Sequence, residues 1–260
     1  MAQDQKPFIV VATPCYGGLV TQAYMLSVLQ LTLLARDAGF EIDVVMLAGD
    51  SLISRARSTL VARFLDNARA THLLFIDADI SFEPDQALRL LAFDKDFVAG
   101  QYPLKQIDWR NFPARVLRGE PLGAAGLSYV GKAETGRARR AADGFVTAQY
   151  AGTGFQLIKR GVLERMIAAY PELKFSKIDT LTNETPNSDN LSALFDCMID
   201  AETGTYLSED YAFCRRWRAI GGEIWIDGRS RLSHTGPQRF DGDCSLRHAA
   251  ASEIAAARRA

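Results

Sequence analysis

Features that mark several common protein classes are scarce in this sequence. Its 260 residues include only four cysteines, with no CxxC pair among them: Cys15, Cys197, Cys214 and Cys244. This spacing argues against a zinc knuckle or a disulfide scaffold and fits a reducing compartment. Acidic and basic residues nearly balance, which leaves a formal net charge of -1. The overall charge therefore gives no attraction towards nucleic acid or an anionic membrane, and we expect no nucleic-acid partner.

Long hydrophobic runs are also missing. The N-terminal apolar run, within PFIVVATP, has about six residues, far short of the roughly 20 that cross a bilayer. We therefore expect a first strand there, no signal peptide and no transmembrane segment. Because 48% of the residues are hydrophobic, the chain can bury a full core. We expect one large cytoplasmic α/β domain without repeats or a dividing linker.

The first part of the chain alternates strand-like and helix-like segments. Hydrophobic patterning predicts strands at 7–14, 41–49 and 71–79, and helices at 22–40 and 54–68. This alternation predicts a parallel, right-handed, doubly wound sheet. Ligands of such sheets bind beyond the carboxyl ends of the strands. The segments that leave the three strands should therefore converge on one crevice.

The second part of the chain is less regular. A helix at 84–93 and a short strand at 96–103 lead into a stretch punctuated by Pro and Gly. Further on, the pattern predicts two strands and an amphipathic helix over 145–171, a helix that ends at Gly221, and a strand with a loop over 223–236. The polar, turn-rich segment before the Gly221 helix is typical of a mobile or lid-like loop.

The stretch LLFIDADISFEP ends a hydrophobic strand in two carboxylates, Asp77 and Asp79. In extended geometry, residues two apart point to the same side of a strand. Two like charges side by side are unfavourable without a counter-charge. Either water solvates the pair in a loop, or a divalent cation such as Mn²⁺ or Mg²⁺ binds it and bridges to a substrate's phosphates. Its position at the third strand's carboxyl end favours a nucleotide-diphosphate site over a chance DxD.

A second acidic group, Ser208-Glu209-Asp210, opens the predicted helix that ends at Gly221. One interpretation is a helix cap, with Ser208 at the N-cap and the two acids placed favourably against the helix dipole. The other is catalytic: Glu209 or Asp210 points into the crevice and positions or deprotonates an acceptor hydroxyl. Both can hold, since one acid can cap while the other reaches the substrate.

Three further motifs could contribute to a ligand site. His234 lies among small polar residues in a predicted loop, where it is either structural or a Mn²⁺ ligand beside the aspartates. Arg55 and Arg57 follow the second strand and are either helix-surface charges or partners of a diphosphate or of the aspartates. Gly152 and Gly154 form either a plain tight turn or a turn that a ligand approaches closely.

Taken in order, VATPCYG, SRARS, FIDADISF, AGTGFQLIKRGVLERM, LSEDYAFCRRWRAIGGEIWID and LSHTG resemble a GT-A glycosyltransferase over residues 8–236. Within that superfamily, the combination is most similar to the Anp1/Mnn9/Van1-like mannosyltransferases. The resemblance implies a Rossmann-like, mostly parallel central sheet flanked by helices, with a smaller acceptor-side sheet. It also implies a nucleotide-binding half at about 7–103, an acceptor-binding half at about 104–240 and a tail helix over 241–260.

The same resemblance implies an activity and a set of site residues. The activity is transfer of mannose from GDP-mannose, with Mn²⁺ or Mg²⁺ and with retention, to a hydroxyl of a glycan, lipid-linked or small-molecule acceptor. A homo-oligomer is compatible with it. The metal ligands would be Asp77, Asp79 and His234, and Glu209 and Asp210 would be the catalytic acids. The nucleotide-sugar would be held by five groups: Thr13, Pro14, Arg57, Asp77 and the turn from Gly152 to Gly154.

Other functions remain open on the sequence. A UDP-sugar-dependent GT-A enzyme of another family would use the same sheet and metal. A sugar-phosphate nucleotidyltransferase would too, but it should carry a basic Gly-rich loop after the first strand, and ATPCYGGLVTQ has no basic residue. A non-catalytic nucleotide-binding protein would not need the acidic and histidine residues described above.

Overall fold

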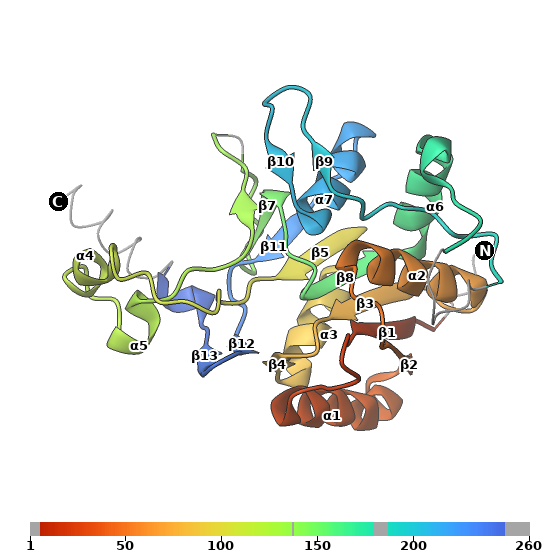
Figure 1. Cartoon of the computed structure of the whole chain (residues 1–260). Coiled ribbons are helices and arrows are strands. Elements are labelled where there is room, and N and C mark those ends of the chain that lie inside the picture. Colours follow the sequence, from red (N-terminus) through yellow and green to blue (C-terminus); the bar gives the residue numbers. More distant parts are fainter. Residues whose placement is uncertain (1–5, 137, 179–186, 248–260) are drawn as a thin grey trace.

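An eight-stranded mixed sheet forms the centre of the computed structural model, which describes residues 6–136, 138–178 and 187–247 (Figure 1). Its strands follow the order β2 (Glu41–Leu47), β1 (Phe8–Pro14), β3 (His72–Ile76), β8 (Phe155–Lys159), β5 (Phe97–Gly100), β11 (Trp225–Asp227), β7 (Phe145–Tyr150) and β6 (Lys132–Ala133). β7 and β8 run antiparallel to their neighbours, and the other six strands share one direction. The predicted mostly parallel α/β sheet is confirmed.

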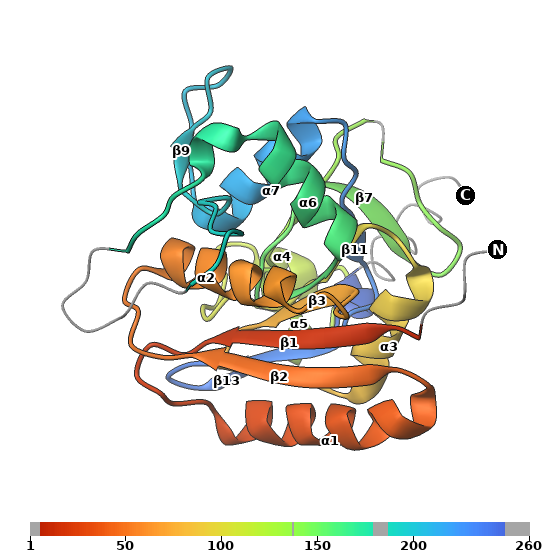
Figure 2. The same cartoon turned by 90° about the vertical axis from the view of Figure 1, so that its right-hand side faces the viewer.

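Two crossover helices connect the first three strands, as the alternating pattern predicts. α1 (Gln22–Ala38) and α2 (Ile53–Asp66) pack on opposite faces of the sheet, because β2 and β3 lie on opposite sides of β1 (Figure 2). Thr21 caps the start of α1 by accepting a hydrogen bond from the Tyr24 N–H, and Gly39 ends it with φ 82°. Glycine adopts this left-handed conformation without strain, so the predicted C-cap is confirmed.

Helices cover both faces of the sheet and close two hydrophobic cores. α2, α6 (Arg160–Ala169) and α7 (Glu209–Ala219) pack on one face, and α1 and α3 (Pro84–Phe93) pack on the other (Figure 2). β8, from the second half of the chain, lies between β3 and β5 from the first. The two halves therefore share one sheet and bring their connecting segments to the same edge.

A small antiparallel sheet lies beyond the end of β3. It has the order β13 (Arg239–Asp241), β12 (Leu232–Thr235) and β4 (Ile80–Phe82), so it joins the chain just after the DAD stretch to the segment that carries His234. A second, two-stranded sheet, β9 (Met198–Ile199) with β10 (Tyr206–Leu207), precedes α7. The prediction of a smaller sheet beside the central one is confirmed.

Short elements fill the remaining segments. These are α4 (Phe112–Val116), α5 (Leu122–Ala125) and the 3₁₀ helix η1 (Pro171–Leu173). The predicted tail helix lies largely outside the described residues, and so do residues 179–186 of the predicted lid-like loop at 174–196. Among the described helices, none combines the length and the apolar character needed to span a bilayer.

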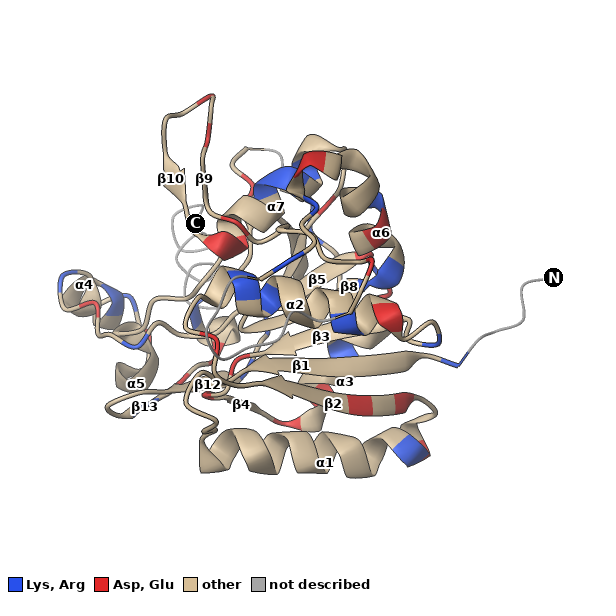
Figure 3. Cartoon of the chain, turned by 45° about the vertical axis from the view of Figure 1, so that its right-hand side comes forward, with Lys and Arg blue, Asp and Glu red and all other residues tan. Residues whose placement is uncertain are grey.

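The outward face of α1 is apolar. Four of its large side chains are 44–76% exposed: Met25, Leu26, Leu29 and Leu33. Figure 3 shows that the charged residues of α1 are confined to its C-terminal end. The helix thus presents hydrophobic surface on the side of the sheet opposite α2.

Candidate functional site

The predicted carboxylate pair lies in a turn and not at the end of an extended strand. β3 ends at Ile76, the N–H of Ile80 donates to the carbonyl oxygen of Asp77 (3.0 Å), and β4 begins at Ile80. Strand alternation therefore does not orient Asp77 and Asp79, and that part of the prediction is wrong. This turn, Asp77-Ala78-Asp79 (the DAD turn), instead directs the two carboxylates to different partners.

Asp77 is paired with the buried guanidinium of Arg57. Arg57 Nη2 donates to Asp77 Oδ1 at 2.9 Å, and Arg57 Nε lies 3.5 Å from Glu209 Oε1. The Arg57 side chain is 4% exposed, and its guanidinium lies over the ring of Phe75, 5.5 Å from the centroid. One buried cation therefore neutralises carboxylates from the DAD turn and from α7, which fixes these two segments together.

Asp79 has a different pair of partners, Lys105 and His234. Lys105 Nζ forms an ion pair with Asp79 Oδ2, and His234 Nε2 lies 3.3 Å from Asp79 Oδ1. Burial would raise the pKa of Asp79, but hydrogen bonds from His234 and Lys105 outweigh it and lower that pKa below its usual value. Asp79 is thus held as a carboxylate, with 29% of its side chain exposed.

His234 lies on the strand β12, and the prediction that it occupies a loop is wrong. Its backbone pairs with Ile80 of β4, which brings it beside the DAD turn. His234 Nδ1 lies 2.8 Å from the carbonyl oxygen of Pro103. Because a carbonyl oxygen only accepts, Nδ1 carries a proton, and Nε2 faces Asp79, to which it donates a hydrogen bond when it is protonated as well. A metal ion bound at Nε2 would take the place of that second proton, and the Nδ1 hydrogen bond to Pro103 would fix the orientation of the ring.

Tyr102 occupies the space between these groups. Its hydroxyl accepts a hydrogen bond from the N–H of Gly154 (3.1 Å), and its ring meets that of His234 edge to face at 5.4 Å. A Cβ atom at Gly152 would lie 2.4 Å from the Tyr102 hydroxyl, and one at Gly154 would lie 2.7 Å from its ring. The two glycines do permit a close approach, as the sequence suggests. Tyr102 approaches both glycines, together with Val130 at Gly152, and binding of a ligand at this turn stays a prediction.

The acids at the start of α7 differ in environment. Ser208 is the N-cap residue, yet its side chain makes no capping bond to the helix backbone, and its hydroxyl donates to the carboxylate of Asp210. Glu209 turns towards Arg57. Burial raises the pKa of Asp210, and the charge of Glu209 raises it further. Of the two acids, Glu209 has the counter-charge and Asp210 is the one that binds a proton more readily than usual.

Other predicted residues are placed away from an open site. Thr13 is fully buried, and its hydroxyl lies 2.6 Å from that of Tyr24, so its side chain supports the β1–α1 packing and is not offered to a nucleotide. Pro14 ends β1 and is partly buried. Arg55 forms a two-bond ion pair with Asp50, at 2.9 and 2.8 Å. Among the two predicted arginines, Arg57 is therefore the one that reaches the aspartates.

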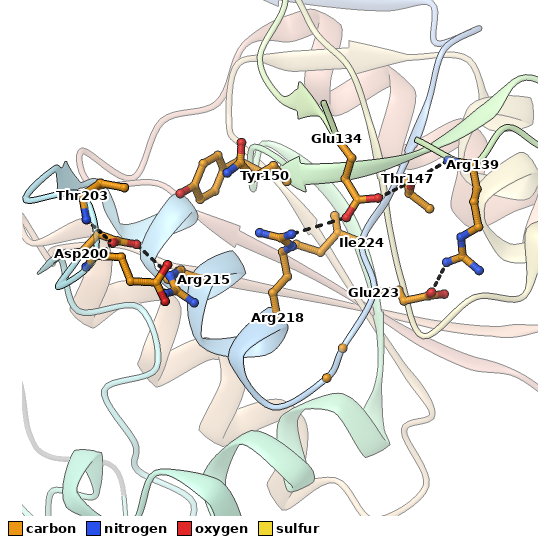
Figure 4. Close-up of a pocket in the computed structure, with 14 residues that line it drawn as sticks. Glu134, Arg139, Thr147, Tyr150, Asp200, Thr203, Arg215, Arg218, Glu223 and Ile224 are labelled. Carbon is orange, nitrogen blue, oxygen red and sulfur yellow. Dashed lines mark hydrogen bonds and ion pairs between the residues drawn. The ribbon is translucent and has the colours of Figure 1, made fainter. Parts of the chain in front are cut away.

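A cavity of about 480 Å³ lies towards the other end of α7 (Figure 4). Its three arginines each form an ion pair with a carboxylate of the same wall: Arg139 with Glu223, Arg215 with Asp200, and Arg218 with Glu134. Since these guanidinium groups are already neutralised, the cavity offers little positive charge to a phosphate. The candidate site is therefore the group of side chains around the DAD turn.

Two of its members, Lys105 and Tyr102, carry no signal that sequence patterning could find. Both lie in the segment that follows β5. Two backbone hydrogen bonds hold this segment in place: the Leu104 N–H donates to Ser128 O (2.7 Å), and the Val130 N–H donates to Tyr102 O (3.0 Å). Their approach to the DAD turn depends on β5 lying next but one to β3 in the sheet, which the order of the sequence does not reveal.

Comparisons with known proteins assign no family. No family model matches the chain, and no curated protein matches it. Among solved structures, it is similar to the crystal structure of A197 from STIV, with 17% sequence identity and a TM-score of 0.48 over 92% of this chain and 91% of that chain. A similarity at this level assigns no activity.

Proposed function

We propose that this protein is a metal-dependent glycosyltransferase that transfers a sugar from a nucleotide-sugar to an acceptor hydroxyl. One observation carries the proposal: the DAD carboxylates, His234, Arg57 and the acids of α7 meet beyond the carboxyl end of β3. Chain segments far apart in sequence contribute them, and this is the edge where α/β sheets bind ligands. GDP-mannose as donor and retention of configuration rest on the sequence resemblance.

The residues around Asp79 fit a hard divalent cation. Asp79 Oδ1 and His234 Nε2 lie 3.3 Å apart, close to the separation of about 3 Å for two ligands at a right angle around an ion with bonds of about 2.1 Å. Asp77 faces Arg57 instead, and over the described residues no three His, Cys, Asp or Glu side chains are grouped to hold a metal. The protein would therefore supply two ligands, and water and donor phosphate the others.

The acidic side chains have distinct roles in this proposal. When bound, Mn²⁺ or Mg²⁺ would neutralise the departing diphosphate. Transfer breaks the bond between the anomeric carbon and the phosphate oxygen and forms one to the acceptor oxygen, while the acceptor's proton goes to the leaving diphosphate. Glu209, which faces Arg57, would stabilise positive charge on the sugar. Arg57 would keep the DAD turn and α7 together around it.

Nucleotide binding tests the proposal directly. GDP, UDP, ADP and CMP are titrated into the protein by isothermal calorimetry, with and without Mn²⁺. We expect metal-dependent binding of GDP, and loss of that metal dependence in Asp79→Asn. Binding of UDP in place of GDP would move the protein to a UDP-sugar enzyme of another GT-A family. If none of the four nucleotides binds, the glycosyltransferase proposal is overturned.

Product formation separates the proposal from the nucleotidyltransferase alternative. A transferase hydrolyses or transfers from the nucleotide-sugar and releases the nucleoside diphosphate. A nucleotidyltransferase instead joins a sugar 1-phosphate to a nucleoside triphosphate and releases pyrophosphate. Assays for the two released products on the same preparation therefore distinguish the two reactions.

A further inference from the structure

Lys105 forms an ion pair with the carboxylate that the proposed function gives to the metal. Asp79 receives Lys105 on Oδ2 and His234 on Oδ1, so its two oxygens face two nitrogen groups. Lys105 is a surface residue whose side chain is 36% exposed. It can therefore leave Asp79 without unfolding anything, unlike the buried Arg57 that holds Asp77.

The fold provides a seat for the Lys105 side chain. A Cβ atom at Gly236 would lie 2.9 Å from Lys105 Cδ, so the aliphatic stem rests against the bare backbone of the glycine that follows β12. The residue two before Lys105, Pro103, supplies the carbonyl oxygen that orients His234. One short segment thus places both the histidine that would bind a metal and the ammonium that stands in a metal's way.

We propose that Lys105 is a built-in competitor of the divalent cation at Asp79. A cation bound between Asp79 Oδ1 and His234 Nε2 would lie close to the ammonium, and the two positive charges would repel each other. The metal therefore binds weakly to the protein alone. A donor diphosphate would reduce this repulsion, because its oxygens can coordinate the metal and also accept hydrogen bonds from the Lys105 ammonium.

This inference rests on the proposed metal site and adds an order of events to it. Metal binding and diphosphate binding assist each other, and the assistance is reciprocal. The protein without donor keeps Asp79 neutralised by its own lysine. With Lys105 on Asp79 and Arg57 on Asp77, neither carboxylate of the pair is left without a counter-charge.

Mn²⁺ binding to the protein without nucleotide tests the competition without any activity measurement. Free Mn²⁺ is measured by electron paramagnetic resonance during titration of wild type and Lys105→Met. We expect Lys105→Met to bind Mn²⁺ at least about tenfold more tightly, the size expected for an ammonium and a dication about 5 Å apart in largely solvated surroundings. Lys132→Met is the matched control, because it removes an exposed lysine for which no contact with Asp79 is seen.

Gly236→Ala provides a second variant that keeps the lysine charge. The added methyl group would displace the Lys105 stem, so Mn²⁺ binding should strengthen here too, by less than in Lys105→Met. Adding GDP should tighten Mn²⁺ binding more in wild type than in Lys105→Met, since the variant has no conflict to relieve. Melting curves of each variant verify that the fold is intact.

The outcomes separate this inference from the proposed function. If Lys105→Met, Lys132→Met and wild type bind Mn²⁺ equally while Asp79→Asn binds none, the metal site stands and the competition is overturned. If no variant binds Mn²⁺ with or without GDP, Lys105→Met included, Asp79 is not a metal ligand and both proposals fall. Weaker binding in Lys105→Met would also overturn the competition, because it would make Lys105 a support of the site.

Discussion

Replacing Arg57 with leucine should destabilise the protein far more than a surface arginine substitution does. The guanidinium side chain is 4% exposed and neutralises Asp77 and Glu209, whose side chains are 26% and 17% exposed. Breaking a buried ion pair costs about 3–5 kcal/mol, because it leaves a buried charge without a partner. Here water reaches both carboxylates in part, so we expect a loss of about 2–3 kcal/mol.

Urea unfolding followed by circular dichroism measures this loss. Arg63→Leu is the matched control, because Arg63 is an exposed arginine of the same helix, and its replacement should cost less than about 0.5 kcal/mol. A double variant, Arg57→Leu with Asp77→Asn, should recover part of the loss, since it removes one of the unpaired charges. A loss for Arg57→Leu that equals the control, or a double variant no more stable than the single, would refute the proposed electrostatic link between the DAD turn and α7.

Three further substitutions test individual contacts. Asp79→Asn should weaken the pH dependence of stability in acid. The pKa of Asp79 is lowered in the fold, so its carboxylate contributes stability above about pH 4 that is lost as pH falls. Acid unfolding curves that are the same in wild type and variant would contradict this. Asp210→Asn should raise stability at pH 7, because burial raises the pKa of Asp210 and the charged form is the unfavourable one. A melting temperature of the variant at pH 7 equal to or below that of wild type would argue against this cost of burying the charge. Thr13→Val should cost about 1–2 kcal/mol in urea unfolding, because it leaves the buried Tyr24 hydroxyl unpaired. Its nucleotide affinity, measured by calorimetry, should equal that of wild type, and a large loss of affinity would restore Thr13 to the nucleotide site.

The regular part of the fold follows from local patterns in the sequence. Continuous apolar runs predict β1 and β3 as buried strands, and helical spacing with Gly39 at the end predicts α1. Strand–helix alternation predicts parallel strands joined by right-handed crossovers. The carboxyl ends of the first three strands are therefore expected at the same end of the sheet. These are properties of neighbouring residues, and tertiary contacts do not override them here.

The site is predicted in its residue types but only in part in its pairing: contact of Arg57 with the aspartates is one of the predicted alternatives, and contact of Lys105 with Asp79 is not predicted. The sequence brings Asp77, Asp79 and His234 into one candidate group, but which cation each carboxylate meets depends on contacts between segments far apart in the chain. Arg57 and Asp77 are 20 residues apart, and Lys105 and Asp79 are 26 apart. No periodic pattern reports such pairs. The turn after β3 also breaks the strand alternation that the prediction assumes.

The two aspartates of the DAD turn are neutralised by one buried and one exposed cation, and this difference gives the two aspartates different roles. Arg57 is buried, pairs with two carboxylates and cannot lose its proton, so Asp77 is held permanently. Lys105 is exposed on a flexible stem, so Asp79 is held by a partner that can be exchanged. An incoming cation would have to break a buried ion pair to reach Asp77, but at Asp79 it displaces a surface one, which costs less. If a divalent cation binds this turn, Asp79 is therefore its ligand, and Asp77 keeps the turn attached to α2 and α7 while the cation comes and goes.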